Sequence, residues 1–433
     1  ELDIGGEEDD IFVRGFHAKE RLGGGDTSFR WTGDLASVQV LGVTPRTRTV
    51  TLWLSDGGRP DHLHDERFLL GCDRLRYTRV VIEGFGYELA PCVVTSDELE
   101  TRLAPVYEKL HVQAGQLFQM TGIQERRYWE PGYTVSQGAT AAAENALRES
   151  PVPANAIDML IYAGVCREHF EPATACHVAA GLQRAGHAIP PSAHVYDVSN
   201  ACLGVLNGVL DIANRIELGQ IRAGMVVSCE TARDIVDTTI TRLTNNPVME
   251  EFKTAIATLT GGSAAVAVIL SDGSFGESER KRLRGAVVEN APEHHMLCRW
   301  GLEAHPDGQA NGTETSLREF ASTDAAAVLE HGVALGARTW DKFLAEMEWP
   351  VQNVDRTVCH QVGSAHRDVM LRTMGLSPEQ DFVTYEYLGN TGTAALPVAT
   401  ALAHERGFLA PGHRVGLLGI GSGLNCMMLG VDW

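Results

Sequence analysis

From about residue 76 to the C-terminus, short apolar runs alternate with longer segments that have helical spacing of their apolar residues. The short runs are bounded by Gly, Asn or Asp and predict buried strands, whereas the longer ones predict amphipathic or buried helices. Strands are expected at Tyr77–Glu83, Asp158–Gly164, His194–Val198, Gly224–Cys229, Gly262–Leu270, Thr357–His360, Arg414–Ile420 and Cys426–Val431. Helices are expected at Ser136–Arg148, Ala173–Leu182, Cys202–Leu218, Ala325–Met347, His366–Met374 and Thr393–Arg406. This alternation predicts an α/β fold with helices covering mixed or parallel sheets.

The N-terminal segment, residues 1–75, has a different pattern. Ser37–Val43 and Thr47–Leu54 are β-branched or alternating, so they predict a small β-rich appendage, or else a piece of a larger β module. His62 and His64 lack a third ligand at a recognisable spacing and predict surface histidines rather than a metal site. The charged segment Glu277–Arg284 predicts a solvated connector between two halves.

Composition narrows the function classes. The 433 residues carry a formal net charge of -20, which disfavours a nucleic-acid or anionic-membrane partner. No uninterrupted apolar stretch is long enough to predict a membrane span, and the first residues lack the pattern of a signal peptide. The 9 cysteines are an odd number without a Cys-x-x-Cys pair, so we expect reduced thiols in the cytoplasm rather than disulfides or bound zinc.

One cysteine differs from the others in its setting. Cys202 follows an apolar strand and a short polar turn, and it stands where a long helix is expected to begin. The helix N-terminus would favour the thiolate, and Ser199 or Asn200 could cap the helix. The alternative is a small core residue, which is the expectation for Cys229 and most other cysteines of the chain.

Two further motifs lie downstream. His360 ends a short strand, and Asn390 lies in a glycine-bounded turn before a helix. Each has an ordinary structural alternative, a core histidine and a helix cap. A cysteine with a distant His and Asn is a nucleophile pattern shared by unrelated folds.

Together, these motifs resemble the ketoacyl synthase III branch of the thiolase superfamily over more than four fifths of the chain. The similar segments occur in the family order, and they are 200–204 (Asn-Ala-Cys-Leu-Gly), 261–265, 360–361 (His-Gln), 389–391 (Gly-Asn-Thr) and 421–423 (Gly-Ser-Gly). The resemblance implies a five-layered αβαβα fold of two similar halves, here residues 76–275 and 276–433, working as a homodimer without a bound cofactor. It also implies an acyl group carried on Cys202, an oxyanion hole formed by the amides of Cys202 and Gly423, and enolate stabilisation by His360 and Asn390.

One departure from the initiating synthases concerns Glu171. Those enzymes usually have an aromatic residue before the proline at this position, whereas a glutamate there resembles the OleA-type synthases, which join two acyl-CoA molecules head to head. Such a condensation loses no CO₂, so a base must remove an α-proton, and Glu171 reaching into the partner's pocket would serve. The alternatives are that Glu171 caps the following helix or pairs with Arg167.

A second departure concerns the thioester carrier. Gln116 and Met120 stand near the positions where the family's CoA-gripping Trp and Arg are found, so coenzyme A and an acyl carrier protein both remain open as carriers. The leading interpretation is an acyltransferase that makes a β-keto acid from two fatty acyl thioesters without decarboxylation. The alternatives are a decarboxylative synthase that uses malonyl carrier protein and a non-catalytic partner subunit. Acyl chain length, the downstream pathway and the role of residues 1–75 stay open.

Overall fold

The computed structural model describes residues 75–276, 281–304 and 317–433, together with four short strands before them: β1 (Val13–Phe16), β2 (Glu20–Arg21), β3 (Ser28–Phe29) and β4 (Thr32–Val38). The chain divides into two compact units, Glu1–Asp73 and Arg74–Trp433. In the first, β1 pairs antiparallel with β4 and β2 with β3. The expected strand at Ser37–Val43 overlaps the end of β4, whereas Thr47–Leu54, His62 and His64 lie outside the described residues.

The second unit is built on a ten-stranded mixed sheet, in the order β10-β9-β11-β12-β6-β13-β18-β17-β16, with β5 paired to β13. Its strands are β5 (Leu75–Arg76), β6 (Val81–Leu89), β9 (Met159–Ala163), β10 (His194–Val198), β11 (Ala223–Glu230), β12 (Ala264–Ser271), β13 (Lys281–Asn290), β16 (Arg356–Cys359), β17 (Arg414–Gly421) and β18 (Asn425–Asp432). The two ends of the sheet repeat one pattern. At one end, β9 is parallel to β11, β11 pairs antiparallel with β12, and β12 pairs antiparallel with β6. At the other end, β16 is parallel to β17, β17 pairs antiparallel with β18, and β18 pairs antiparallel with β13. The expected similarity of two halves therefore appears in the strand order.

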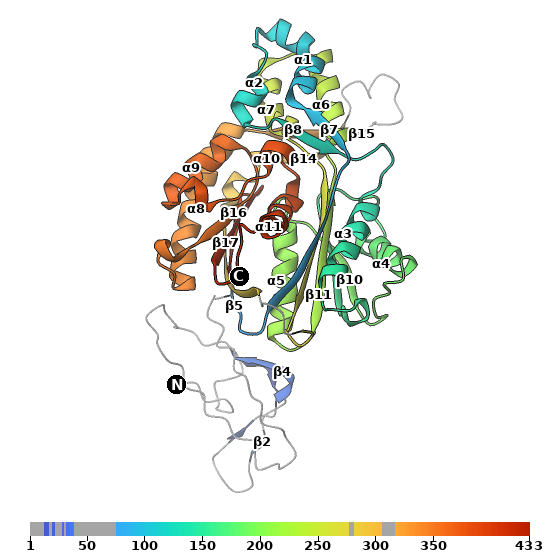
Figure 1. Ribbon diagram of the computed structural model, residues 1–433, viewed down its shortest axis with the longest axis vertical. Helices are drawn as coiled ribbons and strands as arrows, with labels where there is room; N and C mark the ends of the chain where they lie inside the picture. The colour runs from blue at the N-terminus through green and yellow to red at the C-terminus, as the bar shows by residue number, and fades with distance from the viewer. Residues whose placement is uncertain are drawn as a thin grey trace. The chain divides into compact units, whose positions relative to one another are not determined.

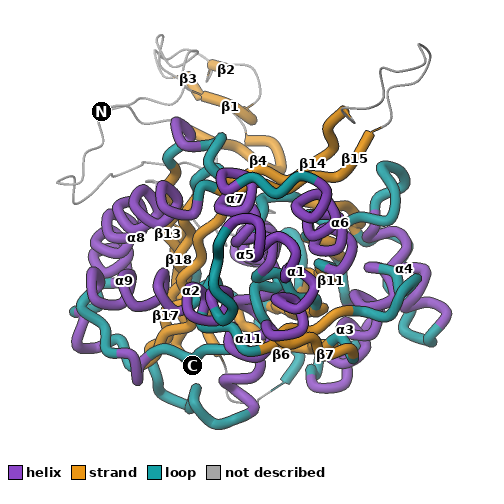
Figure 2. The backbone as a smooth tube through the Cα atoms, turned by 90° about the horizontal axis from the view of Figure 1, so that it is seen from above, coloured by secondary structure: helices purple, strands orange, loops and turns teal. Residues whose placement is uncertain are grey.

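Helices form three layers around the two halves of the sheet (Figures 1 and 2). α5 (Gly204–Glu217) and α11 (Ala395–Glu405) are buried between the halves, because apolar side chains cover most of their surfaces. α3 (Val135–Glu149) and α4 (Thr174–Arg184) cover the outer face of the first half. α8 (Ala325–Met347) and α9 (Ser364–Met374) cover the outer face of the second. The layers are thus αβαβα, as expected.

Both faces of the first half of the sheet are apolar, and β12 shows how. Val266, Val268 and Leu270 point toward the central helices, while Ala265, Ala267 and Ile269 face the outer ones. Alternate residues of a strand point to opposite faces, so a strand buried on both sides is an uninterrupted apolar run. The helix–sheet–helix arrangement is therefore a direct consequence of that run.

A separate cluster of elements lies at one end of the unit and was not anticipated from the sequence. It contains α1 (Ser96–Leu110), α2 (Gln116–Thr121), α6 (Arg233–Asn245) and α7 (Met249–Leu259), with the strand pair β7 (Cys92–Thr95) and β8 (Glu125–Tyr128). The antiparallel hairpin of β14 (Cys298–Ala304) and β15 (Leu317–Thr323) is also additional to the expected elements. A short helix, α10 (Tyr385–Leu388), precedes the asparagine turn.

Two expectations about the sheet were wrong. The first strand was expected at Tyr77–Glu83, but β6 begins at Val81 and continues to Leu89 through Gly84 and Gly86. A Cβ atom at Gly86 would lie 2.2 Å from the carbonyl oxygen of Ala142, so this glycine lets α3 pack directly on the strand. Residues 281–284 were expected in a solvated connector but belong to β13, where Leu283 is buried and Arg284 pairs with Asp432. The charged residues next to Leu283 concealed the alternation of buried and exposed side chains in that strand.

Candidate active site

Cys202 lies in a tight turn between β10 and α5. The amide of Leu203 donates to the carbonyl oxygen of Asn200 at 2.8 Å, and Ala201 has a φ of 44°. That left-handed conformation is strained for alanine and is typical of functional sites. α5 begins at Gly204, so the expectation that Cys202 occupies the first turn of the helix was wrong by two residues.

The cap of α5 comes from a distant part of the chain. Neither Ser199 nor Asn200 caps the helix, contrary to expectation, because α5 has no side-chain cap from its own N-terminal flank. Instead, the amide of Val205 donates to the hydroxyl oxygen of Thr393 at 2.8 Å. Thr393 lies three residues beyond Asn390, so this bond ties the cysteine turn to the asparagine turn.

The thiol of Cys202 is held in its neutral form. Burial, with smaller contributions from Cys298 and Glu230, raises the pKa of Cys202 to about 12. The expectation of a thiol that ionises easily was therefore wrong for this state of the site, because desolvation outweighs the helix N-terminus. Cys202 has to lose its proton as it reacts.

His360 follows β16, and its amide donates to the carbonyl oxygen of Leu418 at 2.9 Å. The side chain is buried, and its Nδ1 atom has no hydrogen-bond partner. Burial, followed by the effect of His366, lowers the pKa of His360 to about 3, so the ring is neutral at physiological pH. A neutral imidazole can donate one hydrogen bond without bringing a charge into the site.

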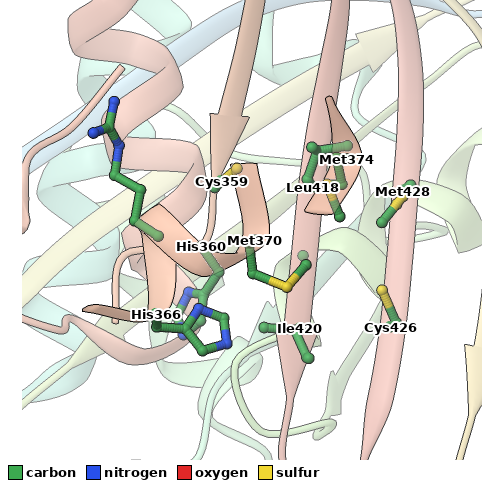
Figure 3. Close-up of a pocket in the computed structure, with 11 residues that line it drawn as sticks. Cys359, His360, His366, Met370, Met374, Leu418, Ile420, Cys426 and Met428 are labelled. Carbon is green, nitrogen blue, oxygen red and sulfur yellow. The ribbon is translucent and has the colours of Figure 1, made fainter. Parts of the chain in front are cut away.

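A small cavity adjoins this histidine. Figure 3 shows the rings of His360 and His366 next to each other, with Met370 and Ile420 beside them. Apart from Arg367 and Gly419, the rest of the lining is apolar or contains sulfur: Cys359, Met374, Leu418, Cys426 and Met428. Burial lowers the pKa of His366 to about 4, so both rings are uncharged at neutral pH.

Asn390 is oriented by its own turn. Its side-chain oxygen accepts from the amide of Gly392 at 3.1 Å, which leaves the Nδ2 group available as a donor. The backbone is held on both sides, because its amide donates to Thr260 at 2.9 Å and its carbonyl accepts from Gly262 at 2.9 Å. The expected glycine-rich segment 261–265 therefore supports the asparagine turn directly.

Gln361 joins the histidine motif to the segment that leads to Asn390. Its Nε2 group donates to the carbonyl oxygen of Cys359 at 2.6 Å. Its Oε1 atom accepts from the amides of Thr384 at 2.8 Å and Tyr385 at 3.2 Å. The fully used side chain fixes the start of α10 relative to β16.

Gly423 lies in the turn between β17 and β18, and this turn packs against the cysteine turn. A Cβ atom at Gly421 would lie 3.4 Å from the amide nitrogen of Cys202. The side chain of Asn425 donates to that of Asn200 at 3.0 Å. The structure thus brings together the turns that carry Cys202, Asn390 and Gly423, with His360 at the end of the neighbouring strand.

Glu171 is not part of this group within one chain. It is exposed on the loop before α4, and in the described part of the chain it makes no hydrogen bond or ion pair. The alternative that it caps α4 was wrong, because Asp197 accepts from the amides of Thr174 and Ala175, each at 2.8 Å. None of the ion pairs in the described part of the chain joins Glu171 to Arg167.

Other regions add little to the chemistry. Gln116 and Met120 lie on α2, where Met120 is exposed. Across residues 75–276, 281–304 and 317–433, no group of three or more His, Cys, Asp or Glu side chains could hold a metal ion. None of the described helices combines the length and the apolar character that crossing a membrane requires.

Three contributors to the site were missed from the sequence: Thr393, Glu230 and His366. Thr393 was read only as the start of a helix. Glu230 directly follows the run expected as a strand at Gly224–Cys229, and a carboxylate at the end of a wholly buried strand is the signal that could have identified it. His366 had no such signal, because it occupies an ordinary position in a polar helix.

Comparisons with known proteins agree with this geometry. Residues 344–433 match the family described as 3-oxoacyl-[acyl-carrier-protein] synthase III C terminal. The acyl-CoA:acyl-CoA alkyltransferase of Shewanella oneidensis is 51% identical over 361 residues, which are 83% of this chain and 100% of that protein. The protein of the same name from Xanthomonas campestris is 32% identical over 82% of this chain and 99% of its own length.

This chain belongs to the OleA-type acyl-CoA:acyl-CoA alkyltransferase family. A solved structure of Xanthomonas campestris OleA, with lauric acid and lauroyl-CoA bound to a cysteine-to-serine variant, superimposes with a TM-score of 0.74 at 32% identity, covering 82% of this chain and 100% of that one. The resemblance to the ketoacyl synthase III branch of the thiolase superfamily is thereby confirmed, and so is the thiolase-like fold. Like its OleA-type relatives, the chain is a condensing enzyme of that superfamily.

Proposed function

We propose that this protein joins two fatty acyl-CoA molecules head to head and yields a β-keto acid without decarboxylation. The observation that carries the proposal is 51% identity to an acyl-CoA:acyl-CoA alkyltransferase over that protein's whole length. The lauroyl-CoA bound to a related structure supports a fatty acyl thioester of coenzyme A as the substrate. This activity would place the protein in lipid metabolism.

In the first step, the sulfur of Cys202 attacks the thioester carbonyl and coenzyme A leaves as its thiol, taking up the proton that Cys202 releases. The high pKa of Cys202 favours this concerted exchange over a preformed thiolate. The amides of Cys202 and Gly423 are proposed to stabilise the oxyanion, and each such donor typically contributes on the order of 100- to 1000-fold in rate. The contact between their two turns supports this role.

In the second step, a base removes an α-proton from the second acyl-CoA. The resulting carbanion attacks the carbonyl carbon of acyl-Cys202, and the Cys202 thiolate leaves and recovers a proton. The neutral ring of His360 and the free Nδ2 group of Asn390 are proposed to donate to the enolate oxygen. Hydrolysis of the remaining thioester then releases the β-keto acid and coenzyme A.

We propose that Glu171 of a second copy supplies the base. The exposed position of Glu171 and the lack of a partner for it among the described residues support a role in a homodimer. Its neighbour Phe170 is 95% exposed, an apolar ring that a second copy would cover. No cofactor takes part in these steps. The eight described cysteines are free thiols, which fits the proposed cytoplasmic location.

The decisive test uses the wild-type protein with one fatty acyl-CoA and no malonyl donor. Intact-protein and peptide mass spectrometry should show an acyl group on Cys202, followed by a free β-keto acid whose carbon count comes from two acyl chains. Product formation only after addition of malonyl carrier protein would identify a decarboxylative synthase instead. The lack of any acyl adduct would indicate a non-catalytic subunit.

A further inference from the structure

Glu230 is a buried carboxylate that the steps above do not use. It is the last residue of β11 and is 4% exposed. Its two oxygens accept from the amides of Val165 at 3.1 Å and Cys166 at 3.3 Å. These residues begin the loop that runs from β9 to Glu171, so the carboxylate holds the origin of that loop.

The same carboxylate contacts the turn that carries Asn390. The backbone of Thr393 also lies close enough to lower the pKa of this carboxylate. A Cβ atom at Gly392, whose φ is 58°, would lie 3.3 Å from the carboxyl carbon of Glu230. Glycine at this position allows both the left-handed turn and the close approach of the carboxylate.

The connection continues to the nucleophile. Thr393, whose backbone lowers the pKa of Glu230, accepts through its hydroxyl from Val205 at the start of α5. Glu230 therefore lies at the meeting point of three segments, which carry Glu171, Asn390 and Cys202. A group that accepts from two backbone amides is geometrically suited to the ionised form.

The charge of Glu230 also acts on its surroundings. Burial raises the pKa of Glu230, and hydrogen bonds from Cys166 and from the amides of Val165, Cys166 and Thr393 oppose that rise. The groups that its charge affects are Cys166, Cys202, Cys229 and Tyr162.

We propose that Glu230 is a positioning residue whose carboxylate clamps the loop leading to Glu171 and the Asn390 turn at one point beside Cys202. The role rests on the proposed condensation, since it orders the groups of the second step relative to the nucleophile. The carboxylate also acts on Cys202 through its charge, because Glu230 is among the groups that raise the pKa of Cys202. Glu230 itself touches no reacting atom.

Two substitutions separate the clamp from the charge. Glu230→Gln removes the charge and points an amide donor at backbone donors, whereas Glu230→Asp keeps the charge on a side chain too short to hold the amides of Val165 and Cys166 and also contact the Asn390 turn. We expect both variants to lose condensation on the order of 100-fold, as a displacement of about 1 Å can cause, with a much smaller loss in single-turnover acylation of Cys202. If Glu230→Gln does not fold, the comparison of condensation with acylation can still be made with Glu230→Asp.

Alkylation of Cys202 by iodoacetamide, followed by peptide mapping over a range of pH, measures the charge independently of catalysis. We expect the pH profile of Cys202 alkylation to shift to lower pH in Glu230→Gln and to match the wild type in Glu230→Asp. A matched control is Glu100→Gln, since Glu100 is also buried and accepts from two backbone amides, those of Gly115 and Leu117, on the α1–α2 connection. Glu100→Gln should lower the melting temperature without shifting the pH profile of Cys202 alkylation.

Two results would overturn the proposal. One is equal loss of acylation and condensation in the Glu230 variants, which would make Glu230 a support of the fold alone. The other is an unshifted alkylation profile in Glu230→Gln. Failure of the condensation itself would appear separately, as a wild-type enzyme that forms no β-keto acid while the alkylation experiment still gives its answer.

Discussion

The hydroxyl oxygen of Thr393 accepts a hydrogen bond from the amide of Val205 at 2.8 Å, across 188 positions of the chain. The bond caps the helix that follows Cys202 with a side chain from the turn that follows Asn390. It also joins the two halves of the repeated fold at the site itself. The turns that carry Cys202 and Asn390 are therefore held together by this hydrogen bond rather than separately by their own helices.

We expect Thr393→Val to destabilise the protein by about 1–2 kcal/mol and to slow acylation of Cys202, because the cap of α5 is lost while side-chain volume is kept. Thr393→Ser should retain most activity, since it keeps the hydroxyl. Chemical denaturation and single-turnover acylation measure the two effects. Thr339→Val is the control: this buried hydroxyl donates to the carbonyl oxygen of Leu335 within α8, and its loss should leave acylation unchanged.

The order of the motifs was sufficient to predict the fold. Cys202, His360 and Asn390 each stand where an apolar strand or a glycine-bounded turn meets a helix, and local periodicity reveals such junctions. The strand order β9-β11-β12-β6 and its repeat could then be inferred from the resemblance. Local pattern also explains the misplaced boundary of β6, because two glycines within a strand are indistinguishable from a turn until the helix packed on them is known.

The contacts between motifs could not be predicted in the same way. The cap from Thr393 and the clamp by Glu230 join residues far apart in the chain, and both depend on the relative position of two halves of the sheet. The protonation state of Cys202 also depends on burial, which a strand–turn–helix pattern does not determine. The helix N-terminus was expected to favour the thiolate, but desolvation of the Cys202 thiol has the larger effect and raises its pKa.

Cys202→Ala should abolish acylation by a fatty acyl-CoA, while Cys229→Ala should leave it nearly intact. Cys202 lies in the turn at the centre of the proposed site, whereas Cys229 is fully buried in β11. Intact-protein mass spectrometry with acyl-CoA gives the answer directly. An acyl adduct that persists on the Cys202→Ala protein would show that another residue is the nucleophile.

His360→Ala and Asn390→Ala should slow condensation far more than the first acylation. The donors on these side chains are needed where enolate charge develops, while transfer onto Cys202 depends mainly on backbone amides. Quenched-flow acylation and steady-state product formation separate the two steps. If acylation collapses as severely as product formation in either variant, the side chain also serves the first step.

The two neutral histidines of the cavity predict how stability depends on pH. Their folded pKa values, about 3 for His360 and about 4 for His366, lie below the ordinary value of 6.5. The unfolded chain therefore binds more protons, so these residues favour folding above about pH 6.5 and lose that contribution as the pH falls toward 4. Each adds a slope of about 1.4 kcal/mol per pH unit within this window.

His366→Phe should reduce the slope of unfolding free energy against pH by about 1.4 kcal/mol per unit between pH 6 and 4.5. Guanidinium denaturation at a series of pH values measures this slope. His187→Gln is the control, because His187 is exposed and its loss should leave the slope unchanged. An identical slope in the wild type and in His366→Phe would mean that His366 is protonated in the folded protein.

Glu171 is the most specific prediction about the proposed reaction. Glu171→Gln keeps the size and most of the hydrogen bonding of the side chain but removes the basic oxygen. Condensation of two acyl-CoA molecules should fall by about 100- to 10,000-fold, which is the usual range for loss of a general base. Acylation of Cys202 should survive, since that step needs no α-proton. Glu168→Gln, on the same loop but half-buried, is the control and should retain condensation.

Mixed dimers test where the carboxylate acts, because Glu171 is exposed and separate from the Cys202 turn within its own chain. A dimer that combines a Glu171→Gln subunit with a Cys202→Ala subunit has one pocket with both groups intact, provided that the glutamate crosses to its partner. Such mixtures should recover part of the activity that both parents lack. Loss in the single variant without recovery would keep the base but assign it to its own subunit. Unchanged condensation by Glu171→Gln would remove the base assignment and favour a decarboxylative route.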